Sequence, residues 1–451
     1  MPELRPYQRE DVEFIKQRKT VGVFNEQRTG KTPTVCVALK EMGISHYVVV
    51  CPNSLLYMWK AAIKTWADID AIVYTNPSCV QSWKESNVPI IINYEQLRGN
   101  KNKQNELVKY LQRRKIEAVV LDEAHTIRNR KNLTCRVCNM LGRRTEIRIA
   151  ITGTPAYNTP QDVWAIANWI SPGYLGTYYD FCRTFFKMDK IFLYGRVIEK
   201  ETVNYIPGRD RILAGMLSKI SVQRKRKDVM DWCLDIEPTV IKLQGSPEQM
   251  HAINCFEKFF EYKDVQTINL LDNMQKIRQV CADMRLIGHT GTSPKTDWCV
   301  SFINDNPDKS VIIFSLSTKY INLLTKVLKE HNIDNATITG DTDTKEREQL
   351  VEDFQNTKIK VLLIQALCGK EGLTLDQADV AIFLDNYPPA GIYNQAKDRL
   401  IATNPDRVKP QELIHVMIQN TYDERLFYLV AHNVKETEVI NDYHKYIRRE
   451  V

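Results

Sequence analysis

The sequence predicts an α/β protein made of two parallel-sheet lobes with a helical region inserted between them. Short apolar runs of strand length alternate with amphipathic stretches over the first 155 residues, and the same alternation returns after residue 295. These runs are continuously apolar, which is typical of parallel strands buried on both faces. The segment between the two regions is aromatic and has helical periodicity instead.

The first lobe is expected to span residues 1–156. Its expected strands are, in order, Thr20–Phe24, His46–Cys51, Pro89–Asn93, Glu117–Asp122 and Arg148–Gly153. The stretches between them, such as residues 55–66 (LLYMWKAAIKTW), carry helical periodicity, so the pattern predicts βαβ units.

The second lobe, residues 293–451, repeats this pattern with a different sequence. Its expected strands are Ser310–Ser315, Asn335–Gly340, Lys360–Ala366, Asp379–Asp385 and Glu412–Ile418. The inserted region, residues 157–292, is expected to be helical and holds the densest basic run, residues 223–228 (QRKRKD). Its aromatic residues are expected to form its core rather than a base-stacking surface; they include Tyr178, Tyr179, Phe185 and Phe186.

Composition excludes several classes of protein. A chain of 451 residues that is 43% hydrophobic can build sizeable cores, which excludes global disorder. No apolar run approaches the roughly 18 residues of a membrane span, and the charged N-terminal segment does not resemble a signal peptide. The net charge of +7 permits a polyanionic partner without requiring one. We expect an intracellular protein, monomeric in isolation, that does not bind membranes.

The cysteines predict a reducing compartment. There are 11 of them, an odd number, and they are scattered singly, which does not suit a disulfide framework. Cys135 and Cys138 have zinc-knuckle spacing, but no second pair of ligands follows nearby. We expect two half-buried thiols on a helix and no metal site there.

A candidate nucleotide site begins where the first expected strand ends. Residues 25–32 (NEQRTGKT) place Gly-Lys-Thr between a strand and a helix, the context that a phosphate-binding loop requires. Backbone amides would hold the phosphates, Lys31 would neutralise them, and Thr32 would be a ligand of Mg²⁺. Asn25 occupies the first glycine position of the motif. We expect it to be tolerated because asparagine can adopt left-handed backbone geometry.

Candidate acidic residues end the fourth expected strand, in the sequence Asp122-Glu123-Ala124-His125. Asp122 would bind Mg²⁺, directly or through water, and Glu123 would orient and activate the attacking water. Residues 152–155 (TGTP) close the next strand and could couple the metal-binding loop to a moving part. Either segment alone could be an ordinary turn, but together with the phosphate loop they indicate ATP hydrolysis.

The order of these motifs resembles that of superfamily-two helicase-type motors, and within them the Swi/Snf-like DNA translocases. The resemblance rests on RPYQ (5–8), TGKT (29–32), DEAH (122–125), ITGTP (151–155), VIIFS (311–315), GKEGLTL (369–375) and QAKDR (395–399). The Swi/Snf-like branch is favoured by NYEQL (93–97), HTIRNRKN (125–132), VQRKRKDV (222–229) and LQGSPEQ (243–249). The resemblance covers residues 4–425 and implies two RecA-like parallel-sheet lobes with an inserted helical region.

The resemblance also implies ATP and Mg²⁺ as cofactors. Gln8 would read the adenine edge, Gly372 would lie in a loop facing both ATP and nucleic acid, and Arg399 would be an arginine finger. The full expected nucleotide-binding set is Arg5, Gln8, Thr29, Gly30, Lys31, Thr32, Gly372, Gln395 and Arg399. The expected catalytic residues are Lys31, Asp122, Glu123 and Arg399, and the expected metal ligands are Thr32 and Asp122.

One position departs from the family pattern. A second arginine normally follows three residues after the first, but here that position is Ala402, and Asn404 and Pro405 replace the usual Gly-Gln. An arginine finger is worth about 10³–10⁵ in rate. We therefore expect weak-to-moderate hydrolysis with Arg399 essential, unless Arg407 reaches back from a rearranged loop.

Nucleic acid is expected to lie across both lobes and to be held mainly by its phosphates, without sequence preference. The expected contacts, in loops that follow strands, are Asn53, Tyr94, Ser317 and Lys370. The basic run Arg224–Lys227 could track a duplex or act as a brace that pairs with acidic residues between the lobes; we favour the brace. Because the aromatics are assigned to the core, no surface for strand separation is recognised, which favours duplex tracking.

The sequence thus predicts an ATP-dependent motor that translocates on or remodels double-stranded DNA. Two alternatives remain open: an ATP-dependent RNA or branched-DNA helicase, and an ATP-gated DNA-binding clamp or loader with weak hydrolysis. A protein partner is compatible with each of them. No histone-reading, zinc-finger or nuclease segment is recognised, so a chromatin role is not supported. Such a bare motor resembles those of bacteriophages, which would place it in the cytoplasm of a bacterial host.

Overall fold

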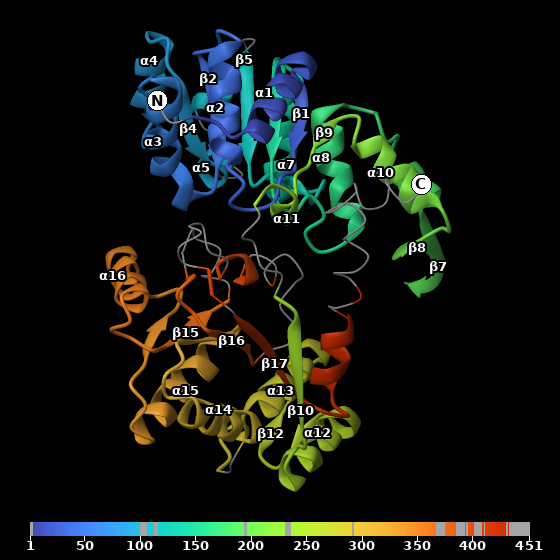
Figure 1. Cartoon of the computed structure of the whole chain (residues 1–451). Helices are drawn as coiled ribbons and strands as arrows, with labels where there is room; N and C mark the ends of the chain where they lie inside the picture. The colour runs from blue at the N-terminus through green and yellow to red at the C-terminus, as the bar shows by residue number, and fades with distance from the viewer. Residues whose placement is uncertain are drawn as a thin grey trace. The chain divides into compact units, whose positions relative to one another are not determined.

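The computed structural model describes most of the chain, and its parts form two compact units. The described residues are 3–99, 106–111, 116–193, 196–230, 236–290, 293–366, 375–384, 393, 396–400, 408–409, 411–429 and 432 (Figure 1). The first unit holds residues up to 230 and the second holds residues 236–432. Each contains one parallel sheet, which confirms the predicted pair of RecA-like lobes. The boundaries at residues 156 and 292 stay a prediction; internal contacts divide the inserted region between the two units.

The first unit is built on seven parallel strands in the order β3-β4-β2-β5-β6-β1-β9. They are β1 (Thr20–Val23), β2 (Tyr47–Cys51), β3 (Ile72–Val73), β4 (Ile90–Asn93), β5 (Ile116–Asp122), β6 (Thr145–Ile151) and β9 (Ser221–Val222). All five predicted runs overlap strands of this sheet. The two unpredicted strands, β3 and β9, are two residues long and lie at the sheet edges.

Two-sided burial explains why these strands are continuously apolar. Successive side chains of a strand point to opposite faces of the sheet. Val48 and Val50 of β2 therefore join the core on one face, while Val49 joins the core on the other. All three side chains are fully buried.

Helices pack on both faces of the first sheet. They are α1 (Pro6–Arg18), α2 (Lys31–Glu41), α3 (Leu56–Ala67), α4 (Ser78–Lys84), α5 (Tyr94–Arg98), α6 (Glu106–Leu111), α7 (Leu133–Gly142), α8 (Val163–Ile170), α9 (Tyr178–Phe185), α10 (Arg209–Leu217) and α11 (Arg226–Val229), with the 3-10 turns η1 (Asn53–Leu55), η2 (Ala124–Ile127) and η3 (Pro160–Asp162). Along α3, buried residues recur three or four positions apart, as in Trp59 and Ile63, so one stripe faces the core. No helix in the described parts of either unit is long and apolar enough to cross a membrane.

Cys135 and Cys138 lie on α7 as predicted, but both are buried rather than half-buried. Their three-residue spacing places both thiols on the face of α7 that joins the core containing Trp169. The Trp169 indole N–H donates to the Cys138 carbonyl oxygen at 2.8 Å. The described residues contain no group of three or more His, Cys, Asp or Glu side chains that could hold a metal ion.

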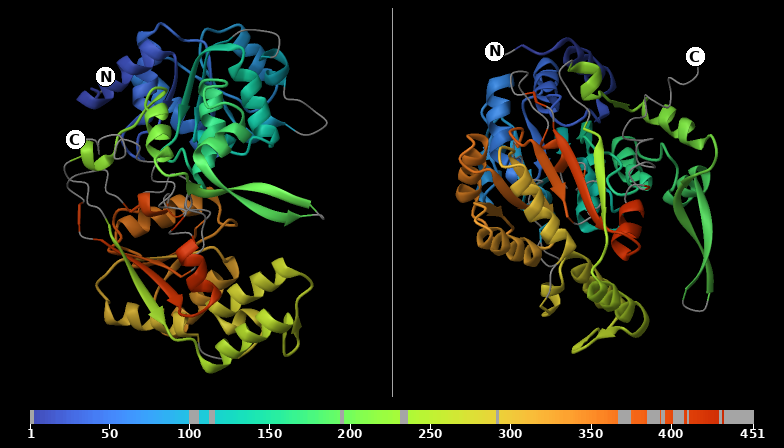
Figure 2. Two further views of the ribbon diagram at one scale, coloured as in Figure 1. Left: turned by 90° about the vertical axis from the view of Figure 1, so that its right-hand side faces the viewer. Right: turned by 60° about the horizontal axis from the view of Figure 1, so that its bottom comes forward.

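The inserted region also contains an antiparallel ribbon that the sequence does not predict. Strands β7 (Phe186–Leu193) and β8 (Arg196–Tyr205) pair along their length and extend from the first unit (Figure 2). Outer side chains on both faces of the ribbon are exposed, so no alternating apolar pattern marks these strands. Among the aromatics assigned to the core, Phe185 and Phe186 are buried, whereas Tyr179 is 53% exposed and does not belong to it.

The second unit is built on six parallel strands in the order β10-β17-β16-β13-β15-β14. They are β10 (Pro238–Leu243), β13 (Val311–Ser315), β14 (Ala336–Ile338), β15 (Val361–Gln365), β16 (Val380–Phe383) and β17 (Glu412–Ile418), and a small hairpin is formed by β11 (Glu261–Tyr262) and β12 (Val265–Gln266). The helical elements are α12 (Pro247–Phe259), α13 (Leu270–Ala282), η4 (Met284–Ile287), α14 (Pro294–Asp305), α15 (Thr318–Glu330) and α16 (Thr344–Gln355). The five predicted strands of this lobe are confirmed, and β10 comes from the inserted region.

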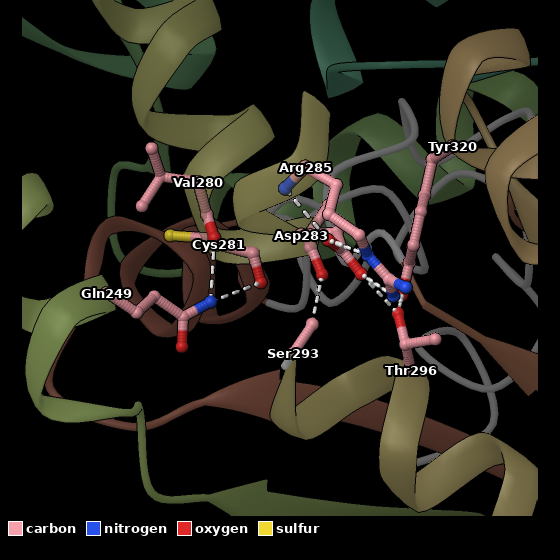
Figure 3. Close-up of polar contacts among 9 residues, drawn as sticks. Gln249, Val280, Cys281, Asp283, Arg285, Ser293, Thr296 and Tyr320 are labelled. Atoms are coloured by element: carbon pink, nitrogen blue, oxygen red, sulfur yellow. Dashed lines mark hydrogen bonds and ion pairs between the residues drawn. The ribbon is translucent and has the colours of Figure 1, made fainter. Parts of the chain in front are cut away.

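A buried polar network joins α12 and α13 to the rest of the second unit (Figure 3). Gln249 of α12 donates to the Val280 carbonyl oxygen at 2.6 Å. Just after α13, the fully buried Asp283 carboxylate accepts from the Arg285 guanidinium at 2.8 Å and from the Thr296 hydroxyl at 2.7 Å. Because a buried polar group without a partner costs about 1–3 kcal/mol, these contacts fix the helical pair against α14.

Candidate functional site

The loop between β1 and α2 lies at the carboxyl end of the first sheet. The helix α2 is preceded by its N-cap residue Gly30, whose φ is 79°, and no side chain caps it in the described structure. Such a helix N-terminus suits an anion, because its first amides face the ligand. Lys31 Nζ and Thr29 Oγ1 both donate to the Glu26 carbonyl oxygen, at 2.9 and 2.7 Å. These bonds close the loop on itself beside the start of α2.

Asn25 fills its motif position for a different reason from the one expected. The left-handed residues of this loop are Arg28, with φ of 66°, and Gly30, whereas Asn25 has no positive φ. Asn25 is buried, and its Nδ2 donates to Asp11 Oδ2 of α1 at 2.6 Å. The expectation of left-handed geometry is therefore wrong: the asparagine side chain ties the loop to α1, which glycine could not do.

Arg5 and Gln8 lie at the start of α1, and Gln8 contacts the same loop. Gln8 Nε2 donates to the carbonyl oxygens of Thr29 at 3.2 Å and Gly30 at 3.3 Å, while Gln8 Oε1 accepts from the Arg5 backbone N–H at 2.8 Å. A β-carbon on residue 30 would displace the Gln8 amide from the loop, and the positive φ of residue 30 favours glycine. The structure thus brings together four predicted nucleotide-binding residues: Arg5, Gln8, Thr29 and Gly30. Adenine recognition by Gln8 stays a prediction.

Asp122 ends β5 and is held by neutral donors. Its Oδ2 accepts from the Trp59 indole N–H at 2.7 Å, and its Oδ1 accepts from the Glu123 backbone N–H at 2.9 Å. Burial, followed by the neighbouring Glu123, raises the pKa of Asp122 to about 6, while Lys31 acts in the opposite direction. A cation at this edge of the sheet would offset the free-energy cost of keeping the buried Asp122 carboxylate ionised. A carboxylate here, with the half-buried Thr32 hydroxyl in the first turn of α2, is a donor set that fits Mg²⁺.

Glu123 adopts left-handed backbone geometry, with φ of 48°. Its Oε1 accepts from Gln27 Nε2 of the phosphate loop at 3.3 Å, and its Oε2 lies 3.2 Å from His125 Nδ1. His125 Nδ1 is also 3.3 Å from Thr152 Oγ1, at the end of β6. Strained geometry of this kind is frequent at functional sites. The contacts connect the phosphate loop, the acidic motif and the Thr-Gly-Thr-Pro segment in one cluster.

Two residues that hold this cluster are missed by the sequence analysis. Trp59 lies on the apolar stripe of α3 and has the pattern of a core residue; its only signal is an indole N–H that needs an acceptor once buried. Gln27 lies inside the loop motif, and no local pattern predicts its contact with Glu123.

The basic run at residues 224–227 pairs with acidic side chains of the first unit. Arg224 Nε lies 3.0 Å from Asp11 Oδ1, and the Arg226 backbone N–H donates to Glu26 Oε2 at 2.7 Å. These residues pair with acids, as the preferred interpretation as a brace expects, but a brace between the lobes stays a prediction. The described partners, however, lie in the first unit beside the phosphate loop rather than between the lobes.

A polar cavity of about 720 Å³ lies in the first unit. It is bounded by α5, the loop after the acidic motif, the turn before α8 and the base of the β7–β8 ribbon. Its lining residues include Tyr94, Arg98, Arg128, Arg130, Lys131 and Glu201. Glu95 and Asp162 line it as well, so four cationic side chains stand against three acidic ones. The four cations are the groups there that can bind phosphates.

The expected nucleic-acid contacts are placed in different surroundings. Asn53 is exposed, and its Oδ1 accepts from Asn93 Nδ2 at 2.8 Å. Tyr94 is buried, and its hydroxyl donates to the Asp122 carbonyl oxygen at 2.7 Å, so it supports the acidic motif rather than facing solvent. Ser317 caps α15 in the second unit, where its Oγ accepts from the Tyr320 backbone N–H at 3.2 Å. Their contacts with nucleic acid stay predictions.

Several predicted residues of the second lobe lie outside the described residues: Lys370, Gly372, Gln395, Ala402 and Arg407. Arg399 is described, and its carbonyl oxygen accepts from the Leu375 backbone N–H at 3.0 Å. Its role as an arginine finger stays a prediction.

Comparison with protein families gives two matches that together cover most of the chain. The SNF2-related domain matches residues 7–295, and the helicase conserved C-terminal domain matches residues 294–402.

Curated relatives are longer than this chain. An uncharacterised ATP-dependent helicase of Mycoplasma pneumoniae is 25% identical over 442 residues, which cover 94% of this chain and 41% of the relative. The ISWI chromatin-remodeling complex ATPase ISW1 of Saccharomyces cerevisiae is 24% identical over 473 residues, covering 94% of this chain and 39% of the relative. The chain thus spans about two fifths of the length of these relatives. A solved SWI2/SNF2 ATPase core of Sulfolobus solfataricus in complex with dsDNA is 20% identical with a TM-score of 0.46, covering 100% of this chain and 95% of that one.

Proposed function

Because the chain belongs to the SNF2-related, Swi/Snf-like family of superfamily-two helicase-type ATPases, we propose that it hydrolyses ATP to translocate on or remodel double-stranded DNA. One observation carries this proposal: Lys31, Asp122 and Glu123 converge at the carboxyl end of the first sheet. ATP and Mg²⁺ are the proposed cofactors. The two curated relatives, an ATP-dependent helicase and a remodelling ATPase by their names, support the assignment.

In the proposed reaction the γ-phosphate of ATP lies at the N-terminus of α2, where backbone amides and Lys31 offset its charge. Glu123 orients a water molecule that attacks the phosphorus in line with the bond to the leaving ADP oxygen. Gln27 and His125 hold the Glu123 carboxylate for this task. A magnesium ion bound by Asp122 and Thr32 would neutralise charge on the phosphate oxygens.

Gln8 would bind adenine with the amide that now holds the phosphate loop. Its Nε2 donates to Thr29 and Gly30, so a base that competes for this group would alter the hold on the loop. Base recognition would then be coupled to phosphate binding, favouring ATP over GTP.

The polar cavity of the first unit supports a phosphate-mediated interaction with nucleic acid. It contains four cationic side chains, Arg98, Arg128, Arg130 and Lys131, together with three acidic ones. If each of the four cations binds one phosphate, the logarithm of affinity should fall with the logarithm of salt concentration with a slope of about −4. A response to salt that is flat would contradict phosphate-dominated binding.

In the second unit, Arg399 is the proposed arginine finger. With Ala402 in place of the second arginine, hydrolysis should be weak to moderate and should depend on Arg399. Substituting Arg399→Ala and Arg407→Ala separately, with steady-state hydrolysis as the readout, tells which arginine acts. Full activity in both variants would overturn the assignment.

The test of the proposed function is ATP hydrolysis with blunt duplex DNA, single-stranded DNA, forked DNA and RNA as stimulants. The proposal expects the largest stimulation by duplex-containing DNA, and its loss in Glu123→Gln. Strongest stimulation by RNA would favour the RNA helicase instead. A Glu123→Gln variant that keeps ATP-dependent DNA loading, while Lys31→Ala loses it, would favour a clamp or loader.

The remaining parts of this proposal concern the setting. We infer sequence-independent DNA binding, a monomer in isolation that could engage a protein partner, and action in a bacterial cytoplasm.

A further inference from the structure

We propose that the β7–β8 ribbon is a wedge that enters the junction between paired and unpaired nucleic acid, where Phe192 stacks on an unpaired base. The inference rests on the proposed function and deepens it by naming a junction as the substrate. It also reverses the expectation, drawn from the sequence, that the chain offers no surface for strand separation.

The outer part of the ribbon presents apolar side chains to solvent. Phe192 is 75% exposed and Val197 is 65% exposed. The two residues pair directly across the ribbon, so their side chains lie on the same face. Ile198, on the opposite face, is also exposed. Large apolar side chains that gather on an exposed surface mark interaction sites.

The base of the ribbon is fixed in the core of the first unit. Phe186 is fully buried, and its ring packs against Tyr205 and Phe181, with ring centroids 4.8 and 5.5 Å away. Further along β8, the Tyr178 hydroxyl donates to the Glu201 carboxylate at 2.8 Å. A wedge must transmit force between its outer end and the motor, and a base anchored in this way meets that requirement.

The fixed base of the ribbon lies beside the polar cavity of the first unit. Glu201 and Tyr178 both line the cavity, together with its four cationic side chains. Val197 lies four residues along β8 from Glu201, which is about 13 Å at about 3.3 Å per residue. This distance spans about four nucleotides at about 3.4 Å per nucleotide of one strand. A strand whose phosphates bind in the cavity therefore brings its bases within reach of Phe192.

Charge favours nucleic acid over a protein as the occupant. The cavity supplies four cations that can bind phosphates, against three acidic side chains, and so carries a small net positive charge. The ribbon itself is nearly neutral, since it carries Lys187, Lys190, Arg196 and Lys200 against Asp189, Glu199 and Glu201. Its outer contacts must therefore be mainly apolar, as when apolar side chains insert between base steps and unstack them. Stacking on an aromatic ring accepts any base, which suits binding without sequence preference.

The test uses the full chain with the double substitution Phe192→Ser and Val197→Ser. A forked DNA carries 2-aminopurine at its first paired position, so that fluorescence reports unstacking on binding. With ATP we expect the variant to separate the fork at least tenfold more slowly and to lose the fluorescence rise. Its DNA-stimulated hydrolysis and its displacement of a third strand from a triplex should stay within twofold of the wild type.

Two further variants control for a general loss of apolar surface. Phe259→Ser removes a ring that is 67% exposed at the end of α12, in the second unit, and should leave fork separation unchanged. Phe192→Trp keeps a stacking surface and should retain separation. All substituted positions are exposed, so thermal unfolding should not shift.

Fork separation at the wild-type rate by the double variant would overturn the wedge. So would a wild-type protein that displaces the third strand of a triplex but never opens a fork, or a double variant whose main defect is capture of a partner protein. A wild-type protein whose hydrolysis no nucleic acid stimulates is a different result, because it contradicts the proposed motor itself.

Discussion

The two units hold the charges near the carboxyl ends of their sheets in different ways. In the second unit, Lys295 and Asp423 form an ion pair of 2.7 Å in which both side chains are almost completely buried. Lys295 Nζ also donates to the Leu384 carbonyl oxygen, just after β16, at 2.6 Å. In this unit two buried charges of opposite sign compensate each other directly.

In the first unit, ion pairs hold Asp11 and Glu26 near the phosphate loop, but three motif residues have hydrogen bonds with neutral partners. Asp122 accepts from the Trp59 indole, Glu123 accepts from the Gln27 amide, and Lys31 donates to a backbone carbonyl oxygen. These neutral partners fix the three side chains in position without neutralising their charge, which can then act on phosphates and a metal ion. The comparison teaches that a buried ion pair indicates a structural role, whereas buried charges with neutral partners indicate a ligand site.

The largest expected effect is on hydrolysis in the first unit. Glu123→Gln keeps the size of the side chain and removes the charge that orients the attacking water, so kcat should fall by about 10²–10⁴. Because glutamine can still accept from the Gln27 amide, the free energy of unfolding should change by less than about 1 kcal/mol. Steady-state hydrolysis and chemical denaturation check both parts. A large loss of stability with modest loss of hydrolysis would break the comparison.

The corresponding change in the second unit should act on stability. Lys295→Met leaves the Asp423 carboxylate buried without its cation, so the free energy of unfolding of this unit should fall by about 3–5 kcal/mol. The double variant Lys295→Met with Asp423→Leu should recover most of the loss. Hydrogen exchange of β13 and β16 reports this unit separately, which a global two-state fit does not.

A matched control is available on the surface of the same unit. Lys309 pairs with Glu412 at 2.8 Å, but both side chains are partly or largely exposed. Lys309→Met should cost at most about 1 kcal/mol. Equal losses in the two methionine variants would show that burial does not distinguish the pairs.

A smaller effect is expected from the neutral partner of Asp122. Trp59→Phe removes the indole donor, so stability should fall by about 1–3 kcal/mol and hydrolysis at limiting Mg²⁺ by about tenfold, because the carboxylate loses its alignment. The control is Trp83→Phe, which removes an equally buried indole that donates to the Val88 carbonyl oxygen. It should cost similar stability without reducing hydrolysis. Similar kinetic losses in both variants would indicate a general packing defect.

The strands and motif residues could be predicted because two-sided burial and strand-to-loop placement leave local signals. Continuously apolar runs mark the parallel strands; Lys31 follows one of these segments, and Asp122 and Glu123 lie at the end of another. Partners that meet through folding leave no such signal. The contact between Gln27 and Glu123 joins residues 96 positions apart, and the bond from Trp59 to Asp122 joins residues 63 positions apart.

Local reasoning also failed where backbone geometry and burial depended on tertiary contacts. Asn25 could be rationalised from its intrinsic tolerance of positive φ, yet Asp11 of α1 determines its role. The β7–β8 ribbon has no core on the two faces of its outer part, so it lacks the alternation that would identify its strands. Its exposed Phe192 becomes informative only once the ribbon is seen.

The smallest predicted effect tests the comparison of the two units through the pH dependence of the stability of the second unit. His415 lies on β17 of the second sheet, where its ring stacks on Phe383 with centroids 5.1 Å apart. Burial, with a further contribution from Lys397, lowers the pKa of His415 to about 4. The unfolded chain, with a histidine pKa of about 6.5, binds this proton more readily, so stability falls as pH drops below about 6.5. The second unit therefore buries His415 in its neutral form, just as it buries Lys295 together with the opposite charge of Asp423.

Between pH 7.5 and 5.5 this histidine should cost the second unit about 1.4 kcal/mol of stability. His415→Phe should remove that part of the pH dependence, measured by hydrogen exchange of β16 and β17 at the two values. His331→Phe, at an exposed position after α15, is the control and should leave the slope unchanged. If His415→Phe keeps the wild-type dependence of stability on pH, then the second unit does accommodate a proton on the buried histidine. Neutral burial would then not distinguish its structural groups from the ligand-directed charges of the first unit.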